Sequence, residues 1–306
     1  MDTIVIGGGS GIIGSQVVEI SKHQGYRPLV LTRDKSRADQ SESYLHWDIS
    51  EGYIDPQIKE ANHIINLAGS GIADGRWTKK RKKEILDSRM DSTQLLINTI
   101  RDQKLDIKSF ISASAIGFYG DGGDVQLDEE DPIQTKEFLS DVCVAWEAAA
   151  APAAKSVDHL CIVRIGTVLS PSGGALEKMT QTIPLGIASY LGSGKQYMSW
   201  IHLEDIARIL VYSISNQLSG IYNAVAPEVL SNKEFTDKLR QAINPKALLL
   251  PAPALGIKVA FGEMSRVVLN SSNISAEKIE NTGFKFSYPT LNLALQELYS
   301  QESESD

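Results

Sequence analysis

Short apolar runs rich in β-branched residues alternate with amphipathic stretches over the first half of the chain. The short runs predict strands, whereas apolar positions spaced three and four residues apart predict helices. The predicted strands are Thr3–Gly7, Pro28–Thr32, Tyr44–Trp47, His63–Leu67, Lys108–Ser114 and His159–Ile165, and the helices are Ile12–Gln24, Trp77–Gln103 and Lys136–Ala154. This alternation is typical of right-handed β–α–β units, so we expect an α/β protein with a doubly wound parallel sheet.

The alternation fades after Gly166 into a glycine-rich stretch that ends near Gly194. Further helices are predicted from about Leu203 and Ser231, and Phe284–Tyr288 has the pattern of a strand. We therefore expect a sheet domain at residues 1–166, to which later segments can return. Residues 167–306 are predicted to form a smaller substrate lobe that includes an appended C-terminal segment at 251–299.

Composition and charge narrow the classes of protein that fit. The 306 residues contain no apolar run long enough to span a bilayer, and Met1 leads directly into a strand, so a cytoplasmic location is expected. Cys143 and Cys161 match neither a metal site nor a disulfide framework, so we predict reduced thiols and no metal. A net charge of −8 argues against nucleic acid as a partner. A small-molecule substrate is expected, and a protein partner or a homodimer remains open.

Glycines at positions 8, 11 and 14 follow the first predicted strand and open the first predicted helix. Gly8 permits the tight turn, Gly11 lets backbone amides approach a diphosphate, and Gly14 lets the helix pack against the sheet. The helix N-terminus favours the anionic group. The pattern predicts a Rossmann-type domain whose dinucleotide contacts Gly8, Ser10, Gly11, Ile12, Ile13 and Gly14.

The end of the second strand distinguishes the two nicotinamide dinucleotides, because an acidic residue there would repel a 2′-phosphate. This chain has Thr32 and Arg33, whose hydroxyl and guanidinium can bind that phosphate, so NADP(H) is favoured over NAD(H). The alternative is that Arg33 is a solvated loop residue. Asp48 is a candidate partner for the adenine amino group. Leu67, Ala68 and Gly69 are expected beside the adenosine and the diphosphate.

Motifs along nearly the whole chain extend this picture beyond the glycine turn. They are Gly8–Gly14, Asn66–Gly69, Ile72–Trp77, Asp87–Arg89, Ser112–Gly120, Gly173–Leu176 and Ser199–His202. Together they resemble the extended and atypical branch of the short-chain dehydrogenase/reductase superfamily, which includes NAD(P)-dependent epimerases and dehydratases, and in particular its YfcH-like epimerase-family subgroup.

The resemblance implies that Glu84, Arg89 and Val168 also lie on the nucleotide, although Glu84 and Arg89 fit exposed helix charges equally well. In this subgroup the C-terminal segment has no defined role. The chain departs from its relatives at Gly69–Gly71, where they read Gly-Glu-Pro, and at Asn270–Asn273, where they carry a Gly-Gly-Gln stretch. A carboxylate near the cofactor is therefore expected to be missing.

The superfamily carries out proton transfer with a Tyr-x-x-x-Lys pair, one helical turn apart, in which lysine lowers the tyrosine pKa. The resemblance places Leu139 and Cys143 at these two positions, and neither side chain can replace the original. Ser114 keeps the serine position of the superfamily, and Tyr119 lies nearby in the sequence. Both are catalytic candidates. Backbone hydrogen bonding by Ser114 and packing by Tyr119 are the alternatives.

Three further features have structural and functional interpretations. The basic run at 79–83 is expected to form a solvated helix face. His202 and Lys178 are candidates for the substrate cleft, with a structural histidine and a surface lysine as alternatives.

Two classes of function stay open, and a vestigial nucleotide site is a third possibility. One is an NADP(H)-binding oxidoreductase or epimerase with a degenerate catalytic centre, acting on a small carbonyl or hydroxyl compound. The other is a non-catalytic regulatory protein that senses cofactor; some chains of the subgroup are labelled cell-division inhibitors.

Overall fold

An eight-stranded sheet forms the centre of the computed structural model, which describes residues 1–170 and 173–300. The strand order is β13-β8-β6-β5-β1-β2-β3-β4, and only the β3–β4 pair is antiparallel. The strands are β1 (Thr3–Gly7), β2 (Arg27–Thr32), β3 (Tyr44–Asp48), β4 (Tyr53–Ile54), β5 (His63–Asn66), β6 (Ile107–Ala115), β8 (Val157–Ile165) and β13 (Gly220–Ala224). The predicted Rossmann-type α/β fold is confirmed.

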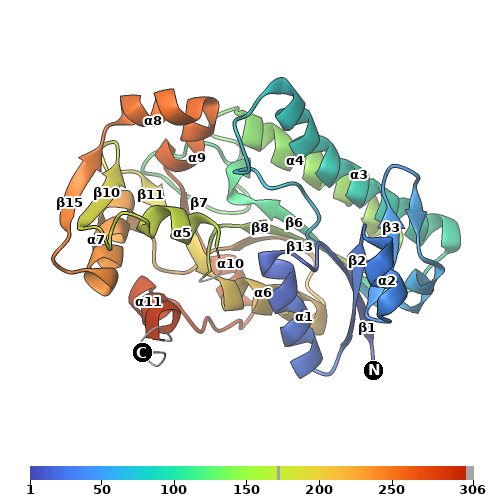
Figure 1. The fold of residues 1–306 in the computed structure, drawn as a ribbon. Coiled ribbons are helices and arrows are strands. Elements are labelled where there is room, and N and C mark those ends of the chain that lie inside the picture. The colour runs from blue at the N-terminus through green and yellow to red at the C-terminus, as the bar shows by residue number, and fades with distance from the viewer. Residues whose placement is uncertain (171–172, 301–306) are drawn as a thin grey trace.

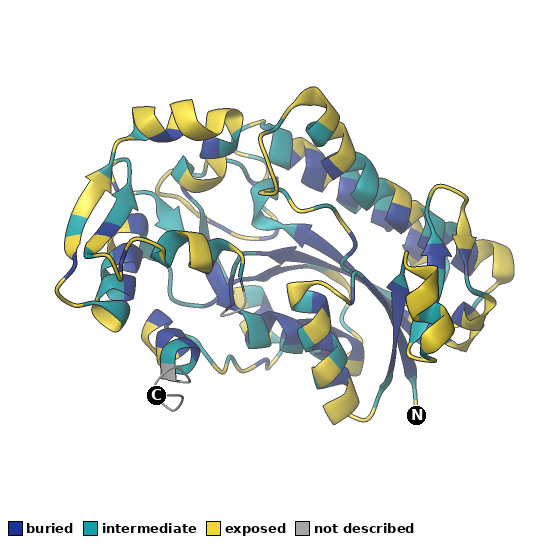
Figure 2. Cartoon of the chain, viewed as in Figure 1, coloured by how far each residue is buried: buried dark blue, intermediate teal, exposed yellow. Residues whose placement is uncertain are grey.

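Helices cover both faces of this sheet. Figure 1 shows α1 (Ile12–His23) and α6 (Leu203–Ser215) on one side, and α3 (Lys79–Gln103) and α4 (Phe138–Ala150) on the other. Alternate residues of β1 point to opposite faces: Ile6 joins the cluster of α1 and α6, and Val5 joins that of α3. Burial on both faces explains why the strands are apolar throughout, and Figure 2 shows the exposed helix surfaces turned away from them.

The six strands predicted from the sequence all occur, with ends within two residues of the expected ones. The predicted strand at Phe284–Tyr288 is wrong. Those residues form an extended connection, because the buried carboxylate of Asp205 accepts hydrogen bonds from the amides of Ser287 and Tyr288, both at 2.9 Å. A side chain thus occupies donors that a neighbouring strand would otherwise bind.

The second lobe is built from segments beyond Gly166, although two of them return to the sheet domain. Helix α6 packs on α1, and β13 pairs with β8 as an edge strand of the main sheet. The lobe has its own core around Trp200, Phe235 and Leu295. Its elements are β9 (Thr167–Leu169), α5 (Ala175–Thr180), β10 (Ile187–Leu191), β11 (Tyr197–Met198), β12 (Trp200–His202), β14 (Leu230–Ser231), α7 (Asn232–Ile243), β15 (Leu248–Ala252) and α11 (Leu291–Ser300).

The C-terminal segment crosses from this lobe back to the sheet domain. Between β15 and α11 it forms α8 (Ala254–Phe261), α9 (Arg266–Leu269), β16 (Asn273–Ile274) and α10 (Glu277–Asn281). Arg76 donates a 2.9 Å hydrogen bond to the Ala260 carbonyl, and Lys82 pairs with Glu263. Strand β16 pairs with β7 (Gln126–Leu127) of the sheet domain. The C-terminal segment therefore contacts the sheet domain at two places, beside the start of α3 and at β7.

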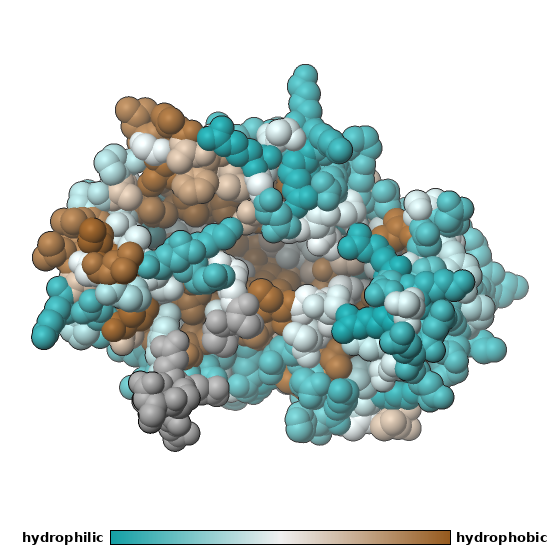
Figure 3. Space-filling view, in the orientation of Figure 1, coloured by the Kyte–Doolittle hydropathy of each residue, from teal (hydrophilic) through white to brown (hydrophobic). Residues whose placement is uncertain are grey.

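The outer surface of this segment is unusually apolar. Leu255 and Val259 of α8 are 74% and 73% exposed, and Figure 3 shows apolar side chains gathered over α8 and β15. None of the helices in the described residues combines the length and apolar character needed to cross a bilayer.

Candidate functional site

The turn between β1 and α1 has the shape that its glycines predict. Gly8 has a φ of +79°, and a Cβ there would lie 2.8 Å from the Leu67 carbonyl carbon. A Cβ at Gly14 would lie 2.2 Å from the Gly8 oxygen, so a side chain at either position would disrupt the packing. The nearest atom to a Cβ at Gly11 is 3.4 Å away, which leaves that side of the turn open.

The start of α1 is free to receive an anion. Gly11 is its N-cap, no side chain caps the helix, and no acidic residue lies in its first turn. Ser10, Gly11 and Ile12 are exposed, whereas Ile13 packs toward the core. Uncapped helix amides together with the helix dipole favour a phosphate group. The turn therefore fits the diphosphate of a dinucleotide.

The adenosine side of the turn carries the residues expected to distinguish the cofactors. Thr32 ends β2, and its hydroxyl accepts a 3.1 Å hydrogen bond from the Asp34 amide. Asp34 in turn caps α2 (Lys35–Gln40), so its carboxylate is held by that helix. Arg33 is exposed and has no hydrogen bond or ion pair within the described part of the chain. Its guanidinium is free to bind a phosphate.

Asp48, the candidate adenine partner, is turned into its own loop. One carboxylate oxygen accepts hydrogen bonds from the amides of Ser50 and Glu51 at 2.9 and 3.2 Å, and from the Ser50 hydroxyl at 2.6 Å. These bonds lower the pKa of Asp48, and the bond from the Ser50 hydroxyl has the largest effect. A single carboxylate oxygen remains for another partner.

The carboxyl end of β5 is fixed by a buried asparagine. Asn66 donates to the Thr93 hydroxyl at 2.9 Å and accepts from the Ala68 amide at 3.2 Å. Leu67 and Val168 pack on the same core cluster, so β5 and β9 bring together two segments that the sequence separates by a hundred residues. Gly69 is exposed beside them.

The two candidate charges on α3 have different surroundings. Glu84 is exposed; it pairs with Arg81 at 2.7 Å and accepts from the Ser70 hydroxyl at 3.3 Å. Arg89 is partly buried, and its guanidinium lies against Gly69, where a Cβ would be 3.0 Å from the guanidinium carbon. Burial lowers the pKa of Arg89. Both side chains reach the turn that follows β5, Glu84 at the Ser70 hydroxyl and Arg89 at Gly69 and the Ser70 carbonyl.

A buried polar network surrounds Ser114 at the end of β6. Its hydroxyl donates to Glu147 of α4 at 2.7 Å, and Glu147 also pairs with the Arg164 guanidinium through bonds of 2.9 and 3.0 Å. Arg164 donates to the Tyr119 hydroxyl at 3.0 Å, which donates to Asn223 of β13 at 2.8 Å. Five side chains, from β6, α4, β8, β13 and the turn at Tyr119, therefore meet in one network.

Tyr119 lies inside this network and is fully buried. Burial raises the pKa of its hydroxyl despite the neighbouring Arg164, and both hydrogen bonds of that hydroxyl are with protein groups. The geometry therefore favours the packing role of Tyr119 over the catalytic one. Ser114 is also buried, but it lies at the carboxyl end of a central strand, where ligands of parallel sheets bind.

Leu139 and Cys143 lie together on α4, facing the 3-10 helix Ile116–Phe118. A Cβ on Gly117 would be 3.3 Å from the Leu139 Cβ and 3.9 Å from the Cys143 sulfur. Burial raises the pKa of the Cys143 thiol to about 11, so it stays protonated at neutral pH. At these two positions α4 therefore has neither a group that exchanges protons at neutral pH nor a cation.

The remaining candidates have structural partners. His202 is buried; its Nδ1 accepts from the Glu204 amide as the cap of α6, and its Nε2 lies 3.0 Å from Glu297. This is the structural role that the sequence left open. Lys178 approaches the Ala73 carbonyl at 3.4 Å across the lobes. Within the basic run, Lys79, Lys80 and Lys83 are exposed, as expected of a solvated face, whereas Arg81 and Lys82 are partly buried against acidic partners.

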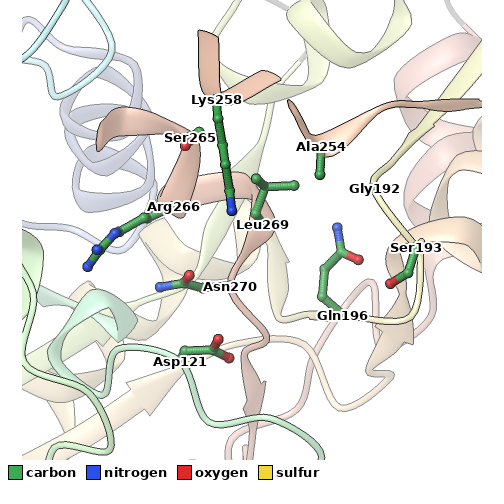
Figure 4. A pocket seen from close by; sticks show the side chains of 10 residues that line it. All are labelled: Asp121, Gly192, Ser193, Gln196, Ala254, Lys258, Ser265, Arg266, Leu269 and Asn270. Carbon is green, nitrogen blue, oxygen red and sulfur yellow. The ribbon is translucent and has the colours of Figure 1, made fainter. Parts of the chain in front are cut away.

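A cavity of about 340 Å³ opens between the lobes and includes residues of the C-terminal segment. Figure 4 shows Lys258 reaching down toward Asn270 and Asp121, with Gln196 across the opening. Asn270 donates to Glu137 at 2.8 Å, and Glu137 is the N-cap of α4. The cavity therefore borders the end of α4 that carries Leu139. No local sequence pattern predicts this cavity, because its walls come from distant segments.

Comparison with known proteins identifies the family. The model of the NAD-dependent epimerase/dehydratase family matches residues 4–224. The chain belongs to this family. A domain of unknown function matches residues 252–298, close to the predicted C-terminal segment. Both findings confirm the resemblance to epimerase-type short-chain dehydrogenases/reductases.

Members of the family align with this chain over almost its whole length. An epimerase family protein of Mycobacterium bovis is 36% identical over 296 residues, covering 95% of this chain and 96% of the relative. A homologue from Mus musculus is 30% identical, covering 96% and 99%. The structure of human epimerase family protein SDR39U1 with NADPH has a TM-score of 0.88 at 29% identity, covering 97% and 99%. The family architecture therefore includes the C-terminal segment.

Proposed function

We propose that this protein binds NADP(H) and acts as an atypical oxidoreductase or epimerase on a small carbonyl or hydroxyl compound. The observation that carries the proposal is the glycine turn, whose open side faces the uncapped start of α1. NADPH in the human relative SDR39U1 supports the same cofactor. NAD appears in a more distant neighbour that shares only the fold, which makes the distinction between the cofactors a question to test.

The residues fit the cofactor as follows. The start of α1 would hold the diphosphate, Gly8 and Gly14 keep that turn tight, and Arg33 with Thr32 would bind the 2′-phosphate. When bound, the nicotinamide ring supplies hydride transfer. The cavity beside α4 would take the substrate, with Asp121, Asn270 and Gln196 as polar groups on its walls.

Ser114 is the group of this network that we assign to substrate. Its hydroxyl donates a hydrogen bond to Glu147. Because Ser114 is buried and does not line the cavity, a substrate oxygen would have to displace part of the surroundings of this serine to accept the hydroxyl proton. Arg164 holds the Glu147 carboxylate in place through bonds of 2.9 and 3.0 Å, which makes both of them positioning residues. A proton donor equivalent to the tyrosine of the superfamily does not occur at Leu139, so turnover is expected to be slow.

Titration of NADPH and NADH by fluorescence tests the cofactor assignment. We expect NADPH to bind at least tenfold more tightly, and Arg33→Asp to remove that preference. Lys35→Asp is the matched control, because it changes the same charge two residues away on an exposed position. Equal affinity for the two cofactors, or an Arg33→Asp variant that keeps the preference, refutes the role of Arg33.

Catalysis is tested by NADPH consumption with a panel of aldehydes, ketones and nucleotide sugars. Turnover that disappears in Ser114→Ala supports the enzyme. The apolar pair Leu139 and Cys143 favours the second candidate, a non-catalytic regulatory protein that changes shape or partner with cofactor occupancy. Tight NADPH binding without turnover of any compound would decide for that candidate.

A further inference from the structure

The cavity between the lobes is lined by more positive than negative charge. Its walls contain two cations, Lys258 of α8 and Arg266 at the start of α9, and one carboxylate, that of Asp121. The whole chain has a net charge of −8, so this positive wall is opposite in sign to the average surface. The charge of the cavity therefore favours an anionic ligand.

The cation of Lys258 is not neutralised by the carboxylate across the cavity. One oxygen of Asp121 accepts hydrogen bonds from the backbone amides of Gly123 and Ser271 at 3.2 and 3.1 Å. Lys258 forms neither a hydrogen bond nor an ion pair within residues 1–170 and 173–300. Figure 4 shows its side chain extended into the opening, toward Asn270. The ammonium group is therefore available to a ligand.

Arg266 adds a second cation whose charge is partly offset. One terminal nitrogen of its guanidinium lies 3.3 Å from the Glu137 carboxylate, and the side chain is 55% exposed. A guanidinium has five N–H donors, so further donors remain for a ligand. Because Glu137 already pairs with Arg266, we expect Lys258 to contribute more to the binding of an anion.

Contacts of the C-terminal segment with the sheet domain hold Lys258 over the cavity. The Ala260 carbonyl, two residues further along α8, accepts a 2.9 Å hydrogen bond from Arg76. Ile257, on the other side of the lysine, is buried. Lys258, Arg266 and Asn270 all lie within residues 252–298, the part of the chain that matches the domain of unknown function. This segment therefore supplies both cations of the cavity.

Two side-chain amides of the cavity offer acceptors for hydroxyl groups. The nitrogen of Gln196 donates to the Leu191 and Val268 carbonyls at 3.1 and 3.3 Å, and that of Asn270 donates to Glu137. Neither amide oxygen accepts a hydrogen bond from the described part of the chain. The volume of about 340 Å³ is near the lower end of the range for ligand pockets, about 300–1,000 Å³, so a small molecule fits.

We propose that Lys258, assisted by Arg266, binds the carboxylate or phosphate group of a small hydroxylated substrate. The C-terminal segment thereby selects anionic over neutral compounds. This inference rests on the proposed function, which assigns the substrate to this cavity. Carboxylate and phosphate share the negative charge and the acceptor oxygens that an ammonium group binds. The two cations determine specificity and take no part in the chemical step.

Three compounds with related carbon skeletons test the charge preference: glycerol 3-phosphate, glycerate and glycerol. Each is titrated by isothermal titration calorimetry into protein saturated with NADPH, so that the glycine turn cannot bind the anion. We expect at least one of the two anions to bind and glycerol not to bind. The anion that binds more tightly shows whether the cavity prefers a phosphate or a carboxylate.

Variants assign this binding to the cavity. Lys258→Met should weaken the anion by about fivefold to tenfold, whereas Lys258→Arg should bind it nearly as well as the wild type. Lys246→Met is the matched control and should change nothing, because Lys246 is an exposed cation of the same lobe outside the cavity. The affinity for NADPH should stay the same in all three variants.

The results that overturn the inference differ from those that refute the proposed function. Absence of binding by both anions, glycerol binding as tightly as the anions, or equal losses in Lys258→Met and Lys246→Met overturn the inference. A wild-type protein that binds no NADPH refutes the proposed function instead. The same comparison of Lys258→Met with Lys246→Met, made without NADPH, then still decides whether the cavity binds the anion.

Discussion

The buried pair of Glu147 and Arg164 offers the sharpest test of how the site is held. Their side chains are 11% and 2% exposed, so removal of either partner leaves a largely buried charge without its counter-ion. The expected cost of breaking such a pair is about 3–5 kcal/mol in the free energy of unfolding. Glu147→Leu also removes the acceptor of Ser114, which adds about 1 kcal/mol.

The comparison that isolates the charge is a double-mutant cycle. Arg164→Met alone leaves Glu147 buried and unpaired, whereas Glu147→Leu combined with Arg164→Met leaves two apolar side chains in contact. We expect the double variant to be more stable than either single variant, with a coupling energy above about 2 kcal/mol. Urea titration followed by circular dichroism measures all three. Additive losses would show that the two charges are solvated and that our account of the network is incorrect.

Three further predictions concern single side chains. Tyr119→Phe should lower the free energy of unfolding, measured by urea titration, by about 1–3 kcal/mol, because the Asn223 side chain loses its hydrogen-bond donor. The affinity for NADPH should not change. A loss of affinity without a loss of stability would contradict the packing role of Tyr119. Burial lowers the pKa of His63 below its value in the unfolded chain, despite the contact with Asp2. The unfolded chain therefore binds more protons, and the free energy of unfolding decreases as the pH falls through about 6.5. Thermal unfolding between pH 8 and pH 5 should show this slope, and His63→Asn should flatten it, whereas an unchanged slope would assign it to other groups. Alkylation of Cys143 by iodoacetamide at pH 7.5 should be slow in the folded protein and fast in urea, since its thiol pKa is about 11; fast modification of the folded state would show an exposed thiolate.

The parts of the molecule that follow from local constraints could be predicted from the sequence. The turn at Gly8–Gly14 requires glycine within a few residues, and the central strands are apolar throughout because both faces are buried. Both patterns are visible in a single stretch of chain. Even the departures at Leu139 and Cys143 could be recognised, because the family resemblance assigns the expected tyrosine and lysine to these two positions.

Contacts between distant segments could not be predicted in this way. Glu147 and Arg164 are 17 residues apart, and Tyr119 and Asn223 are 104 apart, so neither pairing leaves a local pattern. His202 illustrates the same limit. Its sequence context suits a cleft, but its imidazole caps α6 and contacts Glu297 in the last helix. Only the tertiary structure shows which of the two roles the side chain has.

The course of the C-terminal segment restricts how the molecule can open. It is attached to the start of α3 through Ala260 and Glu263, and β16 pairs with β7 of the sheet domain. Rotation of the two lobes as rigid bodies would have to break both attachments at the same time. Exchange of small molecules is therefore expected to depend on local movement of α8 and α9, with the remainder of the lobe staying in place.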